Sequence, residues 1–154
     1  MDARALMTTA VVSITPDAGL NDAASLMVTH GVNALPVLAT DGSVVGVVGI
    51  KDVLRSPIPS AHGTFLNRYQ RLDDRARTLR TVGVDQVMAR QAVTVGPDAS
   101  AADVAATMVN HGIHPLLAVE DGQLLGVNGR ADVVRLMLGV LDGDSNLRGE
   151  EEQE

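Results

Sequence analysis

The sequence has no cysteine and only two aromatic residues. Without cysteine, the 154-residue chain can form neither a disulfide bond nor a thiolate zinc site, and it has no thiol nucleophile. Phe65 and Tyr69 are its only aromatic residues, so stacking platforms for single-stranded nucleic acids are nearly absent. The net charge of −7 also lacks the surplus of lysine and arginine that binding to phosphates of DNA or RNA requires. We therefore expect no nucleic-acid partner.

Long apolar runs and catalytic motifs are missing as well. No stretch approaches the roughly 20 apolar residues that span a bilayer, and the start Met1-Asp2-Ala3-Arg4 does not resemble a signal peptide. These features predict a cytoplasmic protein without a membrane partner. No Ser-His-Asp set, phosphate-binding glycine loop or paired carboxylates can be assembled, and the four histidines lack metal-ligand spacing. We therefore expect neither an enzyme nor a metal site.

What the sequence does contain is a duplication. Pro16-Asp17-Ala18 aligns with Pro97-Asp98-Ala99, and after a one-residue deletion Asp41-Gly42 aligns with Asp121-Gly122. The alignment also matches His30-Gly31 with His111-Gly112, Gly46-Val47 with Gly126-Val127, Asp52-Val53 with Asp132-Val133, and Arg55 with Arg135. Two copies of one unit indicate a pseudo-symmetric domain.

Each copy predicts the same order of elements. Short strands rich in β-branched residues are expected at 11–14 and 92–95, at 32–38 and 113–119, and at 44–48 and 124–127. Apolar stripes predict helices from about residues 20 and 101 that end at Gly31 and Gly112, with Ser100 as an N-cap. Further helices open near Lys51 and Ala131. The fold class is therefore α/β (α+β): tandem β-α-β-β-α repeats that cover their apolar faces by packing about a pseudo-twofold axis.

These elements, with Gly-Val-Asn-Ala-Leu-Pro-Val at 31–37 and Gly-Val-Val-Gly-Ile-Lys-Asp at 46–52, resemble the CBS-domain family. The resemblance implies a stand-alone pair of repeats, 6–55 and 83–141, that binds adenosine-containing ligands in a cleft between them without catalysis. AMP, ADP or ATP is the expected ligand, with S-adenosylmethionine or NAD as alternatives, and no further cofactor is required. It also implies a homodimer that regulates an unidentified effector protein in trans.

The family's ligand motif, Gly-x-x-Ser/Thr-x-x-Asp, implies which residues bind. Asp52 and Asp132 would accept hydrogen bonds from ribose hydroxyls, while Gly49 and Gly129 replace the motif's hydroxyl residue. Arg130 is a better phosphate ligand than Lys51 because its guanidinium can bind in a bidentate manner. The remaining implied contacts are Ser13, Thr15 and Thr94 near the base or ribose, Val32, Leu35, Pro36, Ile113 and Leu116 around the adenine, and His114 facing a phosphate. Leu117 and Asn128 depart from the pattern in the second copy, so one cleft is expected to be degenerate.

Three alternatives remain open from the sequence. Asp52 and Asp132 also stand where an acidic residue would only cap a helix. The missing hydroxyls favour a second function, a scaffold dimer that binds no ligand. Between the repeats, the linker at 56–82 predicts an amphipathic helix at about 64–80 that covers the chain's own core or forms a dimer interface. The acidic tail at 142–154 is expected to be disordered.

Overall fold

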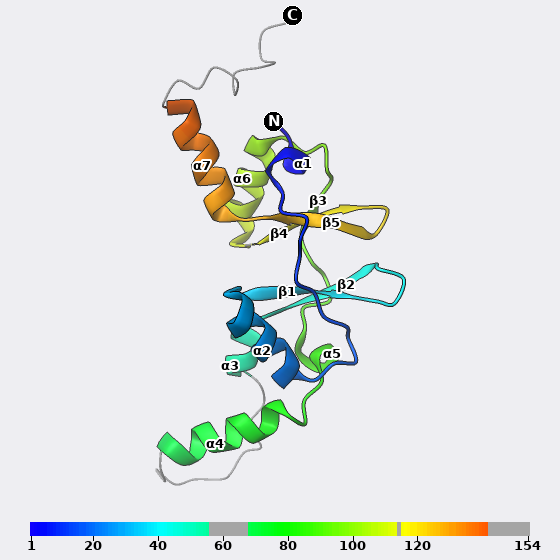
Figure 1. Cartoon of the computed structure of the whole chain (residues 1–154), viewed down its shortest axis with the longest axis vertical. Helices are drawn as coiled ribbons and strands as arrows, with labels where there is room; N and C mark the ends of the chain where they lie inside the picture. Colours follow the sequence, from blue (N-terminus) through cyan, green and yellow to red (C-terminus); the bar gives the residue numbers. More distant parts are fainter. Residues whose placement is uncertain (56–67, 114, 142–154) are drawn as a thin grey trace, which may run out of the picture. The chain divides into compact units, whose positions relative to one another are not determined.

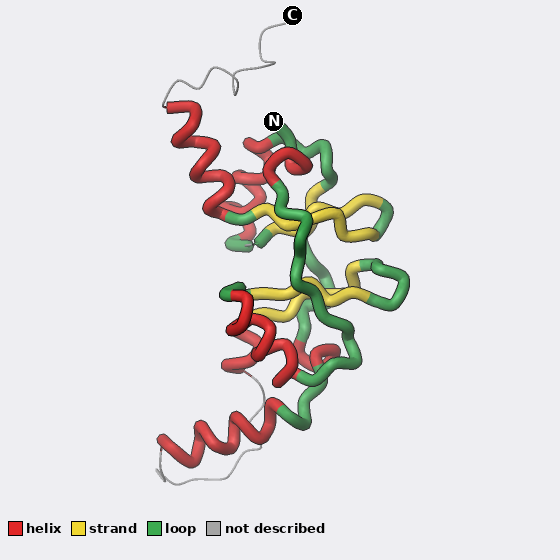
Figure 2. Tube along the Cα trace, viewed as in Figure 1, coloured by secondary structure: helices red, strands yellow, loops and turns green. Residues whose placement is uncertain are grey.

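The computed structural model describes residues 1–55, 68–113 and 115–141 of the chain. Within them the chain forms two compact units. One unit comprises Val12–Ala92, and the other combines Met1–Val11 with the chain from Val93 onward. In each unit helices lie on one side of a small sheet (Figures 1 and 2). The α/β fold class is therefore confirmed.

The unit Val12–Ala92 is built on an antiparallel hairpin. Strand β1 (Ala34–Leu38) pairs with β2 (Val44–Gly49), and Ile14 adds a single parallel bridge to Val37. The strand predicted at 11–14 is thus wrong except for this bridge, because only Ile14 reaches the hairpin edge. Helices α2 (Leu20–His30) and α3 (Ile50–Arg55) lie on one side of the hairpin (Figure 1). The buried core comprises Ile14, Leu20, Ala23, Met27, Leu35, Val37, Val48, Val84 and Met88.

The other unit repeats this plan with a fuller sheet. Strand β3 (Thr94–Val95) runs parallel to β4 (Leu116–Glu120), which pairs antiparallel with β5 (Gln123–Asn128). Helices α6 (Ala101–His111) and α7 (Arg130–Leu141) lie on one side of the sheet (Figure 1). The core comprises Ala3, Val104, Met108, Leu116 and Val133.

The predicted helix ends and turns are confirmed. Ser100 Oγ accepts a hydrogen bond from Asp103 N at 3.1 Å, and Gly31 and Gly112 end α2 and α6 in the left-handed region at φ 64° and 61°. Asp121 and Gly122 both have positive φ, as a two-residue hairpin turn requires. The turn of the first repeat has one residue more, and there Asp41 Oδ1 accepts hydrogen bonds from Ser43 N and Ser43 Oγ.

Each unit also contains a short segment that precedes the other repeat in sequence. Helix α1 (Ala3–Leu6) belongs to the unit of the second repeat, where Ala3 N donates to Ala99 O at 2.7 Å. Helix α5 (Val84–Val87) belongs to the unit of the first repeat, where Val84 N donates to Ala18 O at 2.9 Å. Neither helix is predicted from the sequence, because four residues are too few to show an apolar period.

Glycine allows these segments to approach the sheets. Thr8 exchanges two backbone hydrogen bonds with Val127, and Ala89 does the same with Val47. A Cβ atom on Gly126 would lie 2.7 Å from Thr8 O, and one on Gly46 would lie 2.7 Å from Ala89 O. Both contacts are too short for any side chain. The glycines common to both repeats at these positions are therefore explained by packing rather than by ligand binding.

The linker contains helix α4 (Arg68–Leu79), which agrees with the predicted helix over the described residues. Leu79 packs against the core of the first repeat, whereas Leu72 is 67% exposed. The helix therefore contributes to its own unit near its C-terminal end and leaves part of its apolar stripe uncovered. Residues 64–67, predicted to begin this helix, lie outside the described residues, as does the predicted tail at 142–154. Every helix in the described part of the chain falls short of the length and apolar character that a membrane span needs.

Candidate ligand-binding site

The candidate site in each repeat is the turn that joins the last strand to the following helix. In the first repeat Gly49 ends β2 and Asp52 lies in the first turn of α3. Gly49 N donates to Asp52 Oδ2 at 2.7 Å, and Ile50 N donates to Asn33 O at 2.8 Å. These two bonds fix the carboxylate beside the start of β1.

The second repeat has the same turn. Gly129 N donates to Asp132 Oδ2 at 2.9 Å, and Asp132 lies in the first turn of α7. In both repeats the aspartate therefore makes the capping contact that the sequence left as the alternative to ribose binding. This contact uses one acceptor position, whereas a carboxylate has about four. Capping and ligand binding are compatible for the same side chain.

Arg135 adds a contact that the first repeat does not have. Its Nη1 donates to Asp132 Oδ1 at 2.7 Å, and the side chains of Arg135 and Asp132 are 70% and 20% exposed. Arg135 is not among the site residues predicted from the sequence. The signal was present, because an arginine three residues after an aspartate lies on the same helix face.

The other predicted site residues fall into two groups. Ser13 is half-buried and Thr15 exposed, and both flank Ile14 where it exchanges hydrogen bonds with β1; Thr94 is exposed on β3. Lys51 and Arg130 are exposed in the first turns of their helices. All five residues are at least partly exposed, so a ligand in solution can reach them.

The predicted adenine contacts are less accessible. Leu35 and Leu116 are fully buried in the cores of their own repeats, and Pro36 is also fully buried. Val32 and Ile113 are partly buried against the same cores. Contact of these side chains with a base stays a prediction, and His114 lies outside the described residues.

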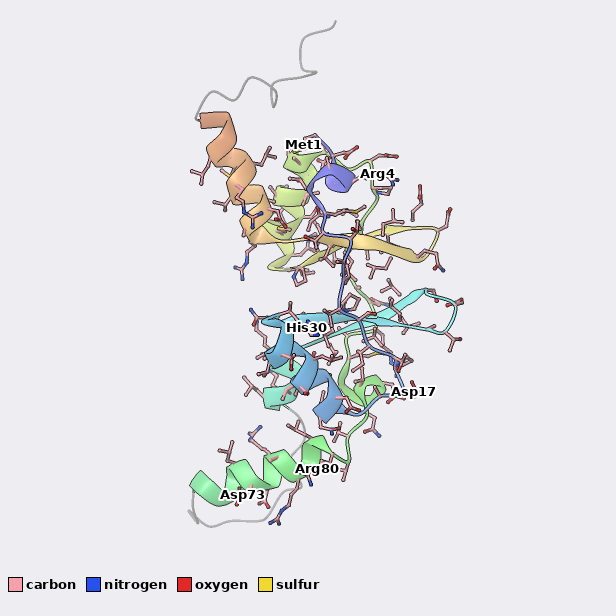
Figure 3. All side chains as sticks on the ribbon, in the orientation of Figure 1. Met1, Arg4, Asp17, His30, Asp73 and Arg80 are labelled. Carbon is pink, nitrogen blue, oxygen red and sulfur yellow. The ribbon has the colours of Figure 1, made fainter. Side chains whose placement is uncertain are left out.

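Asn128 is fully buried at the end of β5, and neither of its amide atoms has a hydrogen-bond partner among the described residues. His111 Nδ1 lies 3.2 Å from Thr107 O at the end of α6, and His30, labelled in Figure 3, is the last residue of α2. In the described ranges, no three histidine or carboxylate side chains are grouped so that they could hold a metal ion.

Comparison with known proteins defines the class. Residues 3–58 and 84–139 each match the CBS domain. The chain therefore belongs to the CBS-domain family, whose paired domains are generally regulatory modules without catalytic activity.

Three relatives illustrate the similarity. The chain is 28% identical over 128 residues to the CBS domain-containing protein YhcV of Bacillus subtilis, covering 82% of this chain and 79% of YhcV. The CBS-pair protein CBSX2 from Arabidopsis thaliana superposes with a TM-score of 0.77 at 24% identity, covering 92% of this chain and 96% of CBSX2. The CBS domain pair of protein MJ0100 gives a TM-score of 0.69 at 19% identity, covering 91% and 98%. CBSX2 has been solved in complex with AMP, and the MJ0100 pair with 5′-methylthioadenosine and S-adenosylmethionine.

The similarity is not confined to proteins of this size. The chain is also 30% identical over 120 residues to a homoserine O-acetyltransferase from Methanosphaerula palustris, of which it spans only 20%. The activity of that longer protein is therefore not transferable through this match.

Proposed function

We propose that this CBS pair binds an adenine nucleotide, with AMP as the first candidate, and that binding regulates an effector protein in trans. The observation that carries the proposal is the Gly-x-x-Asp turn, which occurs with the same backbone contact in both repeats. A carboxylate held in this way has acceptor positions left for the two hydroxyls of a ribose. The AMP complex of CBSX2 supports the choice of ligand.

The phosphate would be held by cations near the same turns. Lys51 lies beside Asp52 in the first repeat, and Arg130 begins α7 in the second. These two residues do not occupy equivalent positions, since the alignment places Ile50 opposite Arg130. A ligand phosphate would therefore meet different geometry in the two repeats, which favours different affinities.

Calorimetric titration with AMP, ADP, ATP, S-adenosylmethionine and NAD tests the proposal. A ligand present at 100 times its dissociation constant should stabilise the fold by about 2.7 kcal/mol in a thermal melt. Asp52→Asn and Asp132→Asn should each remove binding at one repeat, because the amide keeps an oxygen for the glycine N–H but replaces the other oxygen with a donor. Asp22→Asn on α2 is the matched control and should bind normally. If none of the five ligands binds, the proposal is contradicted.

We also propose that the chain forms a homodimer through its helices. Val28 and Val109 occupy equivalent positions on α2 and α6 and are 77% and 80% exposed. Leu54 on α3 and Val134 on α7 are likewise equivalent, at 64% and 51% exposed. Apolar side chains exposed at matching positions in both repeats suit a symmetric contact with a second copy. Val109→Glu combined with Val134→Glu should convert a dimer into a monomer in sedimentation velocity, whereas a monomeric parent protein would contradict the proposal.

A ligand-free scaffold is the second candidate. Gly49 and Gly129 favour it, because they lack the hydroxyl found at this position of the family motif. A dimer that binds none of the five ligands in the titration above would establish it.

A further inference from the structure

The two repeats differ at one oxygen of the motif aspartate. In the second repeat, Asp132 Oδ2 accepts from Gly129 N while Oδ1 accepts from Arg135 Nη1 at 2.7 Å. In the first repeat, Asp52 Oδ2 accepts from Gly49 N, and Oδ1 accepts no hydrogen bond from any described residue. Among the described residues, Asp132 therefore accepts hydrogen bonds on both carboxylate oxygens, whereas Asp52 accepts on Oδ2 alone.

Residue type does not explain this difference. Arg55 stands in the first repeat where Arg135 stands in the second, three residues after the aspartate. The side chain of Arg55 makes no hydrogen bond or ion pair with the residues that the structure describes, and the residue is exposed. Both arginines lie on the same helix face as an aspartate three residues earlier, and of the two only Arg135 places its guanidinium against the carboxylate.

We propose that Arg135 makes Asp132 the weaker of the two ribose acceptors, so that Asp52 takes the first ligand. This inference rests on the proposed nucleotide binding and adds an order of occupation. Ribose hydroxyls that approach Asp132 must share Oδ1 with the guanidinium or displace it, whereas Asp52 Oδ1 is open. Since Arg135 is 70% exposed, its ion pair is weak and lowers the affinity without closing the site.

Adenosine is the probe that isolates this effect, because it carries the ribose but no phosphate that a guanidinium could attract. Two backgrounds leave one repeat each: Asp52→Asn leaves Asp132, and Asp132→Asn leaves Asp52. Into the first we introduce Arg135→Gln, which keeps the three side-chain carbons nearest the backbone and removes the charged guanidinium. Arg55→Gln in the second is the matched control.

Isothermal titration should show weaker adenosine binding in the Asp52→Asn background than in the Asp132→Asn background. Arg135→Gln should tighten binding at Asp132 by about two- to fivefold, the range expected for an exposed ion pair. Arg55→Gln should leave the affinity at Asp52 unchanged. Thermal melts followed by circular dichroism would verify that all four variants fold.

Two results would overturn the inference while leaving nucleotide binding intact. Equal affinities in the two backgrounds would show that Arg135 does not distinguish the repeats. Weaker adenosine binding after Arg135→Gln would show that the guanidinium contacts the ligand instead of competing with it. A parent protein that binds neither adenosine nor AMP would contradict the proposed function itself, and the order of occupation with it.

Discussion

Replacing Asn128 with valine should stabilise the protein. Asn128 is fully buried, and it stands directly opposite Leu116 in the β4–β5 pair. Residues directly opposite in an antiparallel pair lie on one face of the sheet. Leu116 belongs to the apolar core of the second repeat, so the Asn128 amide faces that core as well. Neither amide atom has a hydrogen-bond partner within the described part of the chain.

The first repeat shows which side chain this position accommodates. Val48 occupies the equivalent place, pairs with Leu35 as Asn128 pairs with Leu116, and is fully buried. Leaving a buried amide unsatisfied costs about 1–3 kcal/mol. Valine removes that cost, and its branched Cβ suits a strand. We therefore expect Asn128→Val to raise the free energy of unfolding by about 1–3 kcal/mol.

Urea denaturation followed by circular dichroism measures this change. The reciprocal variant Val48→Asn is the matched control, and it should destabilise the first repeat by at least as much because it also loses an apolar side chain. If Asn128→Val destabilises the protein while Val48→Asn behaves as expected, the Asn128 amide must be hydrogen-bonded in the folded state. That result would refute the reasoning from burial.

Three further predictions follow from other parts of the structure. Gly49→Thr should tighten AMP binding, because a Cβ there would lie 3.4 Å or more from its neighbours and the hydroxyl would restore the family motif; calorimetry checks this, and unchanged affinity would contradict it. Deletion of residues 1–11 should unfold the second repeat but not Val12–Ala92, because Ala3 is buried in the second core; hydrogen exchange would reveal loss of protection, and equal loss in both units would oppose the prediction. Hydrogen bonds from Ser43 lower the pKa of Asp41, so Ser43→Ala should raise that pKa in an NMR titration. Since the folded pKa is the lower one, this stabilisation is present above the usual pKa of aspartate and is lost as the pH falls through the folded value.

The duplication made most of the fold predictable. Because both copies carry the same apolar stripes and Asp-Gly turns, each element could be located twice, and the helix ends at Gly31 and Gly112 agree with the structure. The strand expected at 11–14 was overestimated because β-branched residues do not reveal whether a partner edge is within reach. Helices α1 and α5 were missed since their stability comes from hydrogen bonds to distant segments, such as Ala3 N to Ala99 O.

The candidate site was only partly predictable. The Gly-x-x-Asp turns follow from the sequence, since an aspartate three residues after the N-cap favours this contact. The burial of Leu35 and Leu116 did not follow, because apolar residues of a strand next to a ligand motif look the same whether they face the ligand or the core. The ion pair of Arg135 did not follow either, because Arg55 has the same spacing from its aspartate and makes no such contact.

The differences between the repeats concentrate at the second turn. Asn128 stands immediately before Gly129, at a position that is apolar in the first repeat. Arg135 binds the carboxylate of Asp132. The equivalent residues in the first repeat are Val48, which is fully buried, and Arg55, which makes no contact with Asp52 Oδ1. A second copy that only had to complete the fold would gain stability from valine at position 128. Under the proposed function, a buried amide beside a carboxylate bound on both oxygens therefore favours divergence of the two repeats in ligand affinity rather than in fold.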